Sequence, residues 1–170
     1  SKGAARELAP DAGDDPLALA KALRARFGND AVIVTDGAAG CAVASEAFTG
    51  FVPTRAVKAV DTTGAGDAFL GGLLAGHRLG LGIEDAARLG NACGAACVEV
   101  LGAFPADPDA ARARVIALHA GPALPLPERA APADGSGAVR DAFDATVEGL
   151  AALRGRLDTG TFDAAIALIR

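Results

Sequence analysis

The chain lacks several residue types, and these absences limit the classes of protein to which it can belong. Trp, Tyr and Met are absent, and other aromatic residues are scarce. Because there is no Met, we expect Ser1 not to be a natural start and the chain to be a fragment or a processed product. No segment approaches the roughly 20 consecutive apolar residues that span a bilayer, and no signal peptide is recognisable. We therefore expect no membrane partner.

Positive charge and cysteine are also in short supply. The formal net charge is −5, with 16 Lys and Arg against 21 Asp and Glu, which argues against a nucleic-acid partner. Cys41, Cys93 and Cys97 are odd in number and form no disulfide framework, so we expect a reducing, cytoplasmic location. Cys93 and Cys97 share a predicted helix face, where core packing is favoured over a metal pair because no further ligand is near. His77 and His119 are expected at the surface or at helix ends.

What remains is an Ala-, Val- and Leu-rich composition typical of a soluble globular domain. Just over half of the residues are apolar, and 170 residues suffice for one domain with a small appendage. Asp15 and Pro16 are a typical helix start, and Gly28 a typical helix end. The pattern predicts a helix over 16–27, strands over 31–34, 41–44, 48–52 and 56–60, and helices over 66–79, 84–100 and 108–119.

Beyond residue 120 the composition changes. Residues 121–137 are rich in Pro, Ala, Gly and Ser and predict a linker. Residues 138–170 predict two amphipathic helices, the second still running at Arg170. Their apolar face indicates a dimerisation helix, hence a homodimer. Within them, residues 147–165 loosely resemble the opening helices of sugar isomerase (SIS) domains, which gives the alternative of a truncated second domain.

The most informative stretch is residues 60–69, which read VDTTGAGDAF. A Gly-Ala-Gly turn follows an apolar segment and precedes an apolar helix, so Asp67 lies where that helix begins. The first N–H groups of a helix lack intrahelical partners and carry the positive end of its dipole, which suits phosphate. A carboxylate beside such a site suits proton abstraction, so the pattern indicates phosphoryl transfer. The alternative is an ordinary strand–turn–helix corner with Asp67 as a first-turn charge.

This string closely resembles the second signature of the PfkB/ribokinase family of carbohydrate kinases, D-T-x-G-A-G-D-x-F. The resemblance covers about residues 5–120 and implies the C-terminal, ATP-binding portion of an α/β, ribokinase-like three-layer sandwich. It implies ATP-dependent phosphorylation of a sugar or a sugar-like alcohol. Asp67 would be the base on the sugar hydroxyl, and the N–H groups of Gly64, Ala65 and Gly66 would form the anion hole.

Further matches concern the nucleotide and cations. Residues 34–40, VTDGAAG, look like the family's T-x-G-x-x-G nucleotide turn, although any hairpin can carry such glycines. Residues 91–95 fall where the family packs adenine, although helix packing explains small residues there equally well. The nucleotide contacts implied in this way are Thr35, Gly37, Gly40, Thr63, Asn91 and Ala95.

The family often holds a monovalent cation, K⁺ being the candidate, beside the anion hole. Its ligands would be Asp61, Thr63 and Gly102, unless Asp61 simply caps the turn. The family also uses Mg²⁺, through an N-x-x-E motif that this chain does not match; Glu7 could serve only with a shift.

The family's sugar-binding segment and lid find no match, so we expect the chain not to phosphorylate sugar unaided. Three alternatives stay open: a nucleoside kinase on the same fold, a non-catalytic nucleotide- or phosphosugar-binding module, and a poorly folded fragment that oligomerises through an exposed sheet edge.

Overall fold

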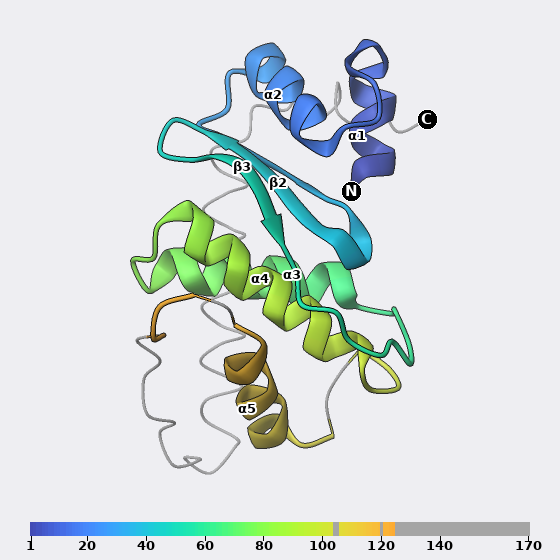
Figure 1. Cartoon of the computed structure of the whole chain (residues 1–170), viewed down its shortest axis with the longest axis vertical. Helices are drawn as coiled ribbons and strands as arrows, with labels where there is room; N and C mark the ends of the chain where they lie inside the picture. The colour runs from blue at the N-terminus through green and yellow to red at the C-terminus, as the bar shows by residue number, and fades with distance from the viewer. Residues whose placement is uncertain (104–105, 120, 125–170) are drawn as a thin grey trace, which may run out of the picture. The chain divides into compact units, whose positions relative to one another are not determined.

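The computed structural model describes residues 1–103, 106–119 and 121–124 (Figure 1). Most of the predicted linker over 121–137 lies outside the described residues. So does the whole predicted helical segment over 138–170, with its dimerisation helix and its SIS-like pattern. Within the described residues, no helix has both the length and the apolar character needed to cross a membrane.

A three-stranded antiparallel sheet forms the middle of the described fold. Its strands are β1 (Ala31–Thr35), β2 (Gly40–Ser45) and β3 (Thr49–Pro53), in the order β1-β2-β3. Every residue of β2 is buried, as expected of a continuous Ala and Val run covered on both faces. The predicted strands over 31–34, 41–44 and 48–52 are thus confirmed, with small changes at their ends.

Helices cover both faces of this sheet, which makes three layers (Figure 1). Ala42 and Ala44 of β2 pack with Leu19 and Leu23 of α2 (Pro16–Phe27). Alternate residues of a strand point to opposite faces. Cys41 and Val43 therefore belong to a second core cluster, which includes residues of α3 (Ala65–Arg78) and α4 (Ile83–Val98). The small apolar side chains of β2 therefore pack against α2 on one face of the sheet and against α3 and α4 on the other.

The N-terminal layer combines one predicted helix and one missed helix. The Asp15 carboxylate accepts a hydrogen bond from the N–H of Ala18 at 3.0 Å, and α2 ends at Gly28 with φ of 66°, both as predicted. The helix α1 (Lys2–Leu8) was not predicted; the Ser1 hydroxyl caps it. A short 3₁₀ turn (Pro10–Ala12) joins α1 to the loop before α2.

The helices α3 and α4 pack closely because glycines face the contact. A Cβ on Gly72 would lie 2.7 Å from Cys93 Sγ and 2.9 Å from the Leu89 carbonyl oxygen. A Cβ on Gly90 would lie 2.9 Å from the Phe69 carbonyl oxygen. Real Cβ contacts are longer than this, so only glycine permits this approach of the two backbones.

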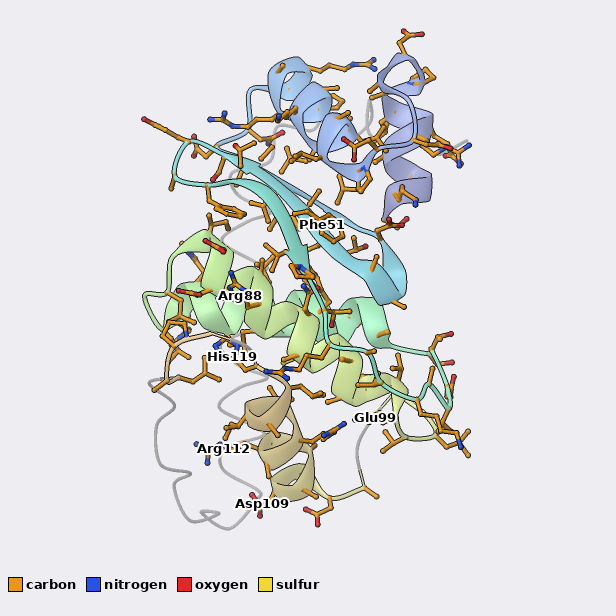
Figure 2. All side chains as sticks on the ribbon, in the orientation of Figure 1. Phe51, Arg88, Glu99, Asp109, Arg112 and His119 are labelled. Carbon is orange, nitrogen blue, oxygen red and sulfur yellow. The ribbon has the colours of Figure 1, made fainter. Side chains whose placement is uncertain are left out.

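The helix α5 (Pro108–Leu118) packs on α4 through Ala92, Ala95, Val115 and Leu118. Figure 2 shows His119 at the end of α5. It is a helix-end residue, as expected, and it is half-buried, with both ring nitrogens shielded from solvent. His77, in the last turn of α3, is exposed, as expected.

The predicted strand over residues 56–60 is wrong. The segment pairs with no strand in the part of the chain that the structure describes. It crosses the end of α4, where the N–H groups of Val60 and Asp61 donate to the Val98 carbonyl at 2.7 and 3.2 Å. Val57 contributes to the α4–α5 core cluster, while Val60 is exposed. The Val98 carbonyl thus accepts the Val60 N–H in place of a strand partner, and packing of Val57 on the α4–α5 cluster accounts for one of the apolar residues.

Candidate nucleotide site

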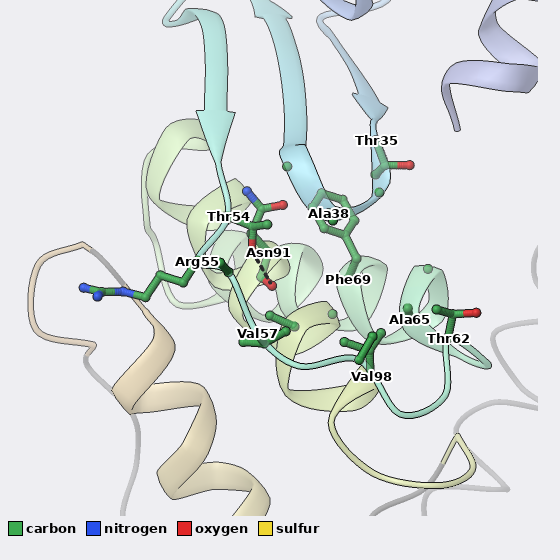
Figure 3. A pocket seen from close by; sticks show the side chains of 17 residues that line it. Thr35, Ala38, Thr54, Arg55, Val57, Thr62, Ala65, Phe69, Asn91 and Val98 are labelled. Carbon is green, nitrogen blue, oxygen red and sulfur yellow. Dashed lines mark hydrogen bonds between the residues drawn. The ribbon is translucent and has the colours of Figure 1, made fainter.

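A pocket of about 350 Å³ opens beside the sheet, between the turn after β1, the segment from residue 54 to 62 and the helices α3 and α4 (Figure 3). It joins parts of the chain that are distant in sequence. The residues that line it are Thr35, Gly37, Ala38, Gly40, Thr54, Arg55, Ala56, Val57, Ala59, Thr62, Ala65, Gly66, Phe69, Asn91, Gly94, Ala95 and Val98.

The pocket brings together most of the residues that we expected to bind nucleotide. The five that line it are Thr35, Gly37, Gly40, Asn91 and Ala95, and Ala65 and Gly66 of the expected anion hole lie beside them. Thr63, Gly64 and Asp67 do not line it. The arrangement therefore places one end of the cavity at the beginning of α3.

The turn after β1 requires glycine at its end. Gly40 has φ of 124°, and a Cβ there would lie 2.2 Å from the Val52 carbonyl oxygen of the neighbouring strand. The N–H of Asp36 donates to the Gly40 carbonyl at 2.8 Å, and the N–H of Thr54 donates to the Ala39 carbonyl at 3.2 Å. The turn is thus fixed between β1 and β3 and forms one wall of the pocket.

The second turn, at the start of α3, also depends on glycine. Gly64 has φ of 79°, and its Cβ would lie 2.6 Å from Ala103 Cβ. No side chain caps α3. The N–H of Ala65 donates to the Thr62 carbonyl at 3.3 Å, whereas the next N–H groups of the first turn have no intrahelical acceptor. The positive end of a 14-residue helix therefore faces the pocket at Gly66.

Asp67 lies in the first turn of α3 and is exposed. It makes no hydrogen bond or ion pair with another residue in the part of the chain that the structure describes. Burial raises the pKa of the Cys97 thiol, and the negative charges of Asp61 and Asp67 raise it further. Asp67 thus lies near the turn while its carboxylate stays free to bind a further group.

Asp61 connects the three residues that we expected to hold a cation. Its Oδ1 accepts from the N–H of Thr63 at 2.9 Å, and its Oδ2 accepts from the N–H of Gly102 at 3.0 Å. Hydrogen bonds from Thr63 and then from Gly102 lower the pKa of Asp61. The carboxylate therefore caps this turn and ties it to the loop after α4, as our alternative interpretation of Asp61 required.

The cysteines do not form a metal site with other residues of the described segments. No group of three or more His, Cys, Asp and Glu residues lies close enough there to hold a metal ion. Burial raises the pKa of Cys41 to about 12 and that of Cys93 to about 11. Cys97 Sγ donates to the Thr63 carbonyl at 3.5 Å, behind the α3 turn. Cys41 is buried, whereas Cys93 and Cys97, which we expected in the core, are half-buried.

Asn91 lines the pocket, but its amide has a structural partner. Its Nδ2 donates to the Val52 carbonyl at 2.9 Å, which ties α4 to β3, and the Thr54 hydroxyl donates to the Asn91 carbonyl at 3.5 Å. The residues that the sequence did not point to are mainly those of segment 54–59. We interpreted residues 56–60 as a strand, so this part of the segment gave no signal for a pocket wall.

Comparison with known proteins identifies the class. Residues 4–110 match the model of the pfkB family carbohydrate kinases, and the chain belongs to this family. It is 47% identical over 90 residues to probable fructokinase-5 of Arabidopsis thaliana, which is 49% of this chain and 28% of that protein.

Two solved structures confirm the ribokinase-like fold. Fructokinase from Vibrio cholerae, with fructose, ADP and calcium bound, is 35% identical with a TM-score of 0.54, over 67% of this chain and 39% of that chain. The nucleoside kinase of Burkholderia thailandensis, in complex with inosine, is 30% identical with a TM-score of 0.53, over 68% and 35%. The chain thus spans well under half the length of these relatives. The family match ends at residue 110, so the SIS-like tail stays a prediction.

Proposed function

We propose that this chain is the nucleotide-binding part of an ATP-dependent kinase that phosphorylates a hydroxyl group of a sugar. One observation carries the proposal: the turn after β1 and the start of α3 line the same pocket, although about 25 residues separate them in the sequence. A nucleotide needs both an apolar wall for its base and N–H donors for its phosphates.

The phosphate end would be the start of α3. The unpaired N–H groups near Gly66 and the positive helix end favour anions, and none of the described residues that line the pocket has a carboxylate to repel them. Such prearranged donors stabilise charge on the transferring group without reorganisation. Gly64 keeps this turn close to Ala103, where a side chain would collide.

Asp67 would take the proton of the acceptor hydroxyl. Its carboxylate is exposed and has no partner among the described residues, so a substrate hydroxyl can reach it. A base of this kind typically contributes ~10²–10⁴ in rate. The loose transition state of phosphoryl transfer makes little demand on the strength of the base.

Cations would assist at two places. A monovalent cation such as K⁺ would bind near Asp61, Thr63 and Gly102, where each carboxylate oxygen keeps a lone pair after its one backbone hydrogen bond. Mg²⁺, when bound to the phosphates, would neutralise their charge. No described residue of the pocket wall offers it a carboxylate, and Glu7 lies in a different depression on α1, so we assign Mg²⁺ no ligand here.

Fructose is the acceptor that the fructokinase relatives suggest, while the inosine-bound relative supports a nucleoside acceptor as the second candidate. The chain covers at most 39% of these structures, which supports our expectation that it does not turn over sugar alone. A non-catalytic nucleotide-binding module is consistent with the same coverage. A cytoplasmic location and a homodimer stay predictions.

The test is the substitution Asp67→Asn. ADP affinity is measured by calorimetry, and sugar-dependent ATP turnover is measured in a form of the protein that has kinase activity. We expect ADP affinity within about threefold of the wild type and a loss of turnover of ~10²-fold or more. Turnover that survives the substitution would refute the role of Asp67. A kinase is refuted, and a binding module favoured, if ADP binds but no form phosphorylates fructose, inosine or related alcohols.

A further inference from the structure

The loop after α4 holds the turn at the start of α3 in place. The Gly102 N–H donates to Asp61 Oδ2 at 3.0 Å, and Oδ1 of the same carboxylate accepts the Thr63 N–H at 2.9 Å. Ala103 lies so close to Gly64 that a Cβ on this glycine would be 2.6 Å from Ala103 Cβ. The position of this loop therefore determines the position of the turn.

An ion pair anchors the loop at the point where it leaves α4. Glu99 is the C-cap residue of α4 (Figure 2), and a carboxylate at the negative end of a helix dipole is unfavourable unless a cation accompanies it. Arg114 of α5 supplies that cation with two hydrogen bonds, from Nε to Oε2 at 2.6 Å and from Nη2 to Oε1 at 2.7 Å. These hydrogen bonds lower the pKa of Glu99. Arg114 therefore fixes the first residue of the loop with bidentate geometry.

The ion pair extends the contact between α4 and α5 to the very end of α4. The apolar contacts of α5 involve Ala92 and Ala95, which lie about one and two turns before Glu99. The Arg114 side chain is 47% exposed, and ion pairs at such positions contribute little to overall stability. The pair is thus better placed to set the position of the loop than to stabilise the fold.

We propose that Arg114 is a positioning residue for the expected anion hole at the start of α3 and that it acts through Glu99 and the loop after α4. The inference rests on the proposed function, because it assumes that the nucleotide phosphates bind at this turn. No residue of α5 is among the described residues that line the pocket, so Arg114 acts through the loop and not by contact with the nucleotide. Helix α5 thereby contributes to phosphate binding from outside the pocket.

The test measures the affinity of the 170-residue chain for the β,γ-imido analogue of ATP and for adenosine by calorimetry. Arg114→Met and Glu99→Met each leave an unbranched side chain without the hydrogen bonds of the pair, and a double variant combines them. Arg78→Met is the control, because Arg78 is an exposed cation in the last turn of α3, at the other end of that helix from the turn. Circular dichroism checks that each variant is folded.

The two single variants separate positioning from long-range electrostatics. Arg114→Met removes a positive charge and Glu99→Met removes a negative charge, so an electrostatic effect alone would weaken binding of the ATP analogue in the first and strengthen it in the second. Positioning predicts weaker binding in both, by about three- to tenfold, with no further loss in the double variant. Affinity for adenosine, which carries no phosphate, should stay within about twofold of the wild type.

Several results would overturn the inference while leaving the proposed function intact. They are a Glu99→Met variant that binds the ATP analogue as tightly as the wild type or more tightly, losses that add in the double variant, and losses that adenosine shares equally. A loss of the same size in Arg78→Met would also overturn it. A wild-type chain that does not bind the ATP analogue would instead contradict the proposed function and, with it, this inference.

Discussion

Two neighbouring glycines of α3 allow the packing of α3 on α4 to be tested with an internal control. Gly71 is exposed, and a Cβ there would meet no atom within 4 Å, whereas a Cβ on Gly72 would lie 2.7 Å from Cys93 Sγ and 2.9 Å from the Leu89 carbonyl oxygen. Both glycines lie inside the helix, so Ala at either position gains about 0.8–1 kcal/mol of helix propensity.

The net effects should have opposite signs. Gly71→Ala has no steric cost, so we expect the free energy of unfolding to rise by about 0.5–1 kcal/mol. Gly72→Ala must push α4 away, and overpacking typically costs about 1–3 kcal/mol. We expect an overpacking cost near the upper end of this range, because one of the close contacts is with a backbone atom. After the gain in helix propensity, the free energy of unfolding should fall by about 1–2 kcal/mol.

Urea unfolding followed by far-ultraviolet circular dichroism is the suitable assay, because the chain has no Trp or Tyr to report by fluorescence. ADP affinity should fall in Gly72→Ala, since Asn91 and Ala95 of the pocket move with α4, and stay unchanged in Gly71→Ala. Equal stabilisation by both substitutions would refute the close approach of α3 and α4.

Two further substitutions test buried and capping groups. Hydrogen bonds from Thr63 and Gly102 lower the pKa of Asp61 in the folded chain, so its stabilising effect is complete above the unfolded value of about 3.9 and is lost as the pH falls through the lower folded value. The stability difference between wild type and Asp61→Asn, measured by urea unfolding, should be constant from about pH 7 to 5 and shrink below about pH 4; a difference that grows on acidification would contradict the cap. Both ring nitrogens of His119 are buried and have no hydrogen-bond partner among the described residues. His119→Leu should therefore raise the free energy of unfolding at pH 7 by about 1 kcal/mol, and a marked loss would indicate a partner for the ring.

Local signals accounted for much of the fold. Asp15, Pro16 and Gly28 delimit α2 because a helix cap and a helix stop act within a few residues. The buried run of β2 was also visible in the sequence, since a strand covered on both faces has no polar alternation. These elements depend on neighbours in the chain and could be predicted without knowledge of the fold.

The failures concern segments whose neighbours lie far away in sequence. Residues 56–60 have the apolar pattern of a strand, but the N–H of Val60, at the end of the segment, donates to Val98 at the end of α4. The helix α1 was missed because its seven residues carry little apolar periodicity and a single capping hydroxyl at Ser1. No pattern within a few residues indicates which distant segment a stretch of chain will contact, and here the contacting residues, Val60 and Val98, lie about 40 positions apart.

The candidate site likewise has features that local motifs predicted and features that depend on the fold. The two glycine turns were predicted from their motifs, and the pocket unites them. The sequence could not tell that the Asn91 amide bonds to Val52, nor that Arg55 stands at the rim, because both facts depend on how β3 lies against α4. Asp61 was predicted with two roles, and the contacts to Thr63 and Gly102 establish the capping role.

The most direct test of the nucleotide site is an ADP titration of the wild type and of Gly66→Leu by calorimetry. Gly66 lines the pocket, a Cβ on it would meet no atom within 4 Å, and its φ is not positive, so the backbone there accepts a side chain, and Leu would occupy the proposed phosphate end. We predict one ADP bound per wild-type chain and at least a tenfold loss of affinity in Gly66→Leu, with an unchanged circular dichroism spectrum. Equal ADP affinity in the two proteins would contradict a phosphate site at the start of α3.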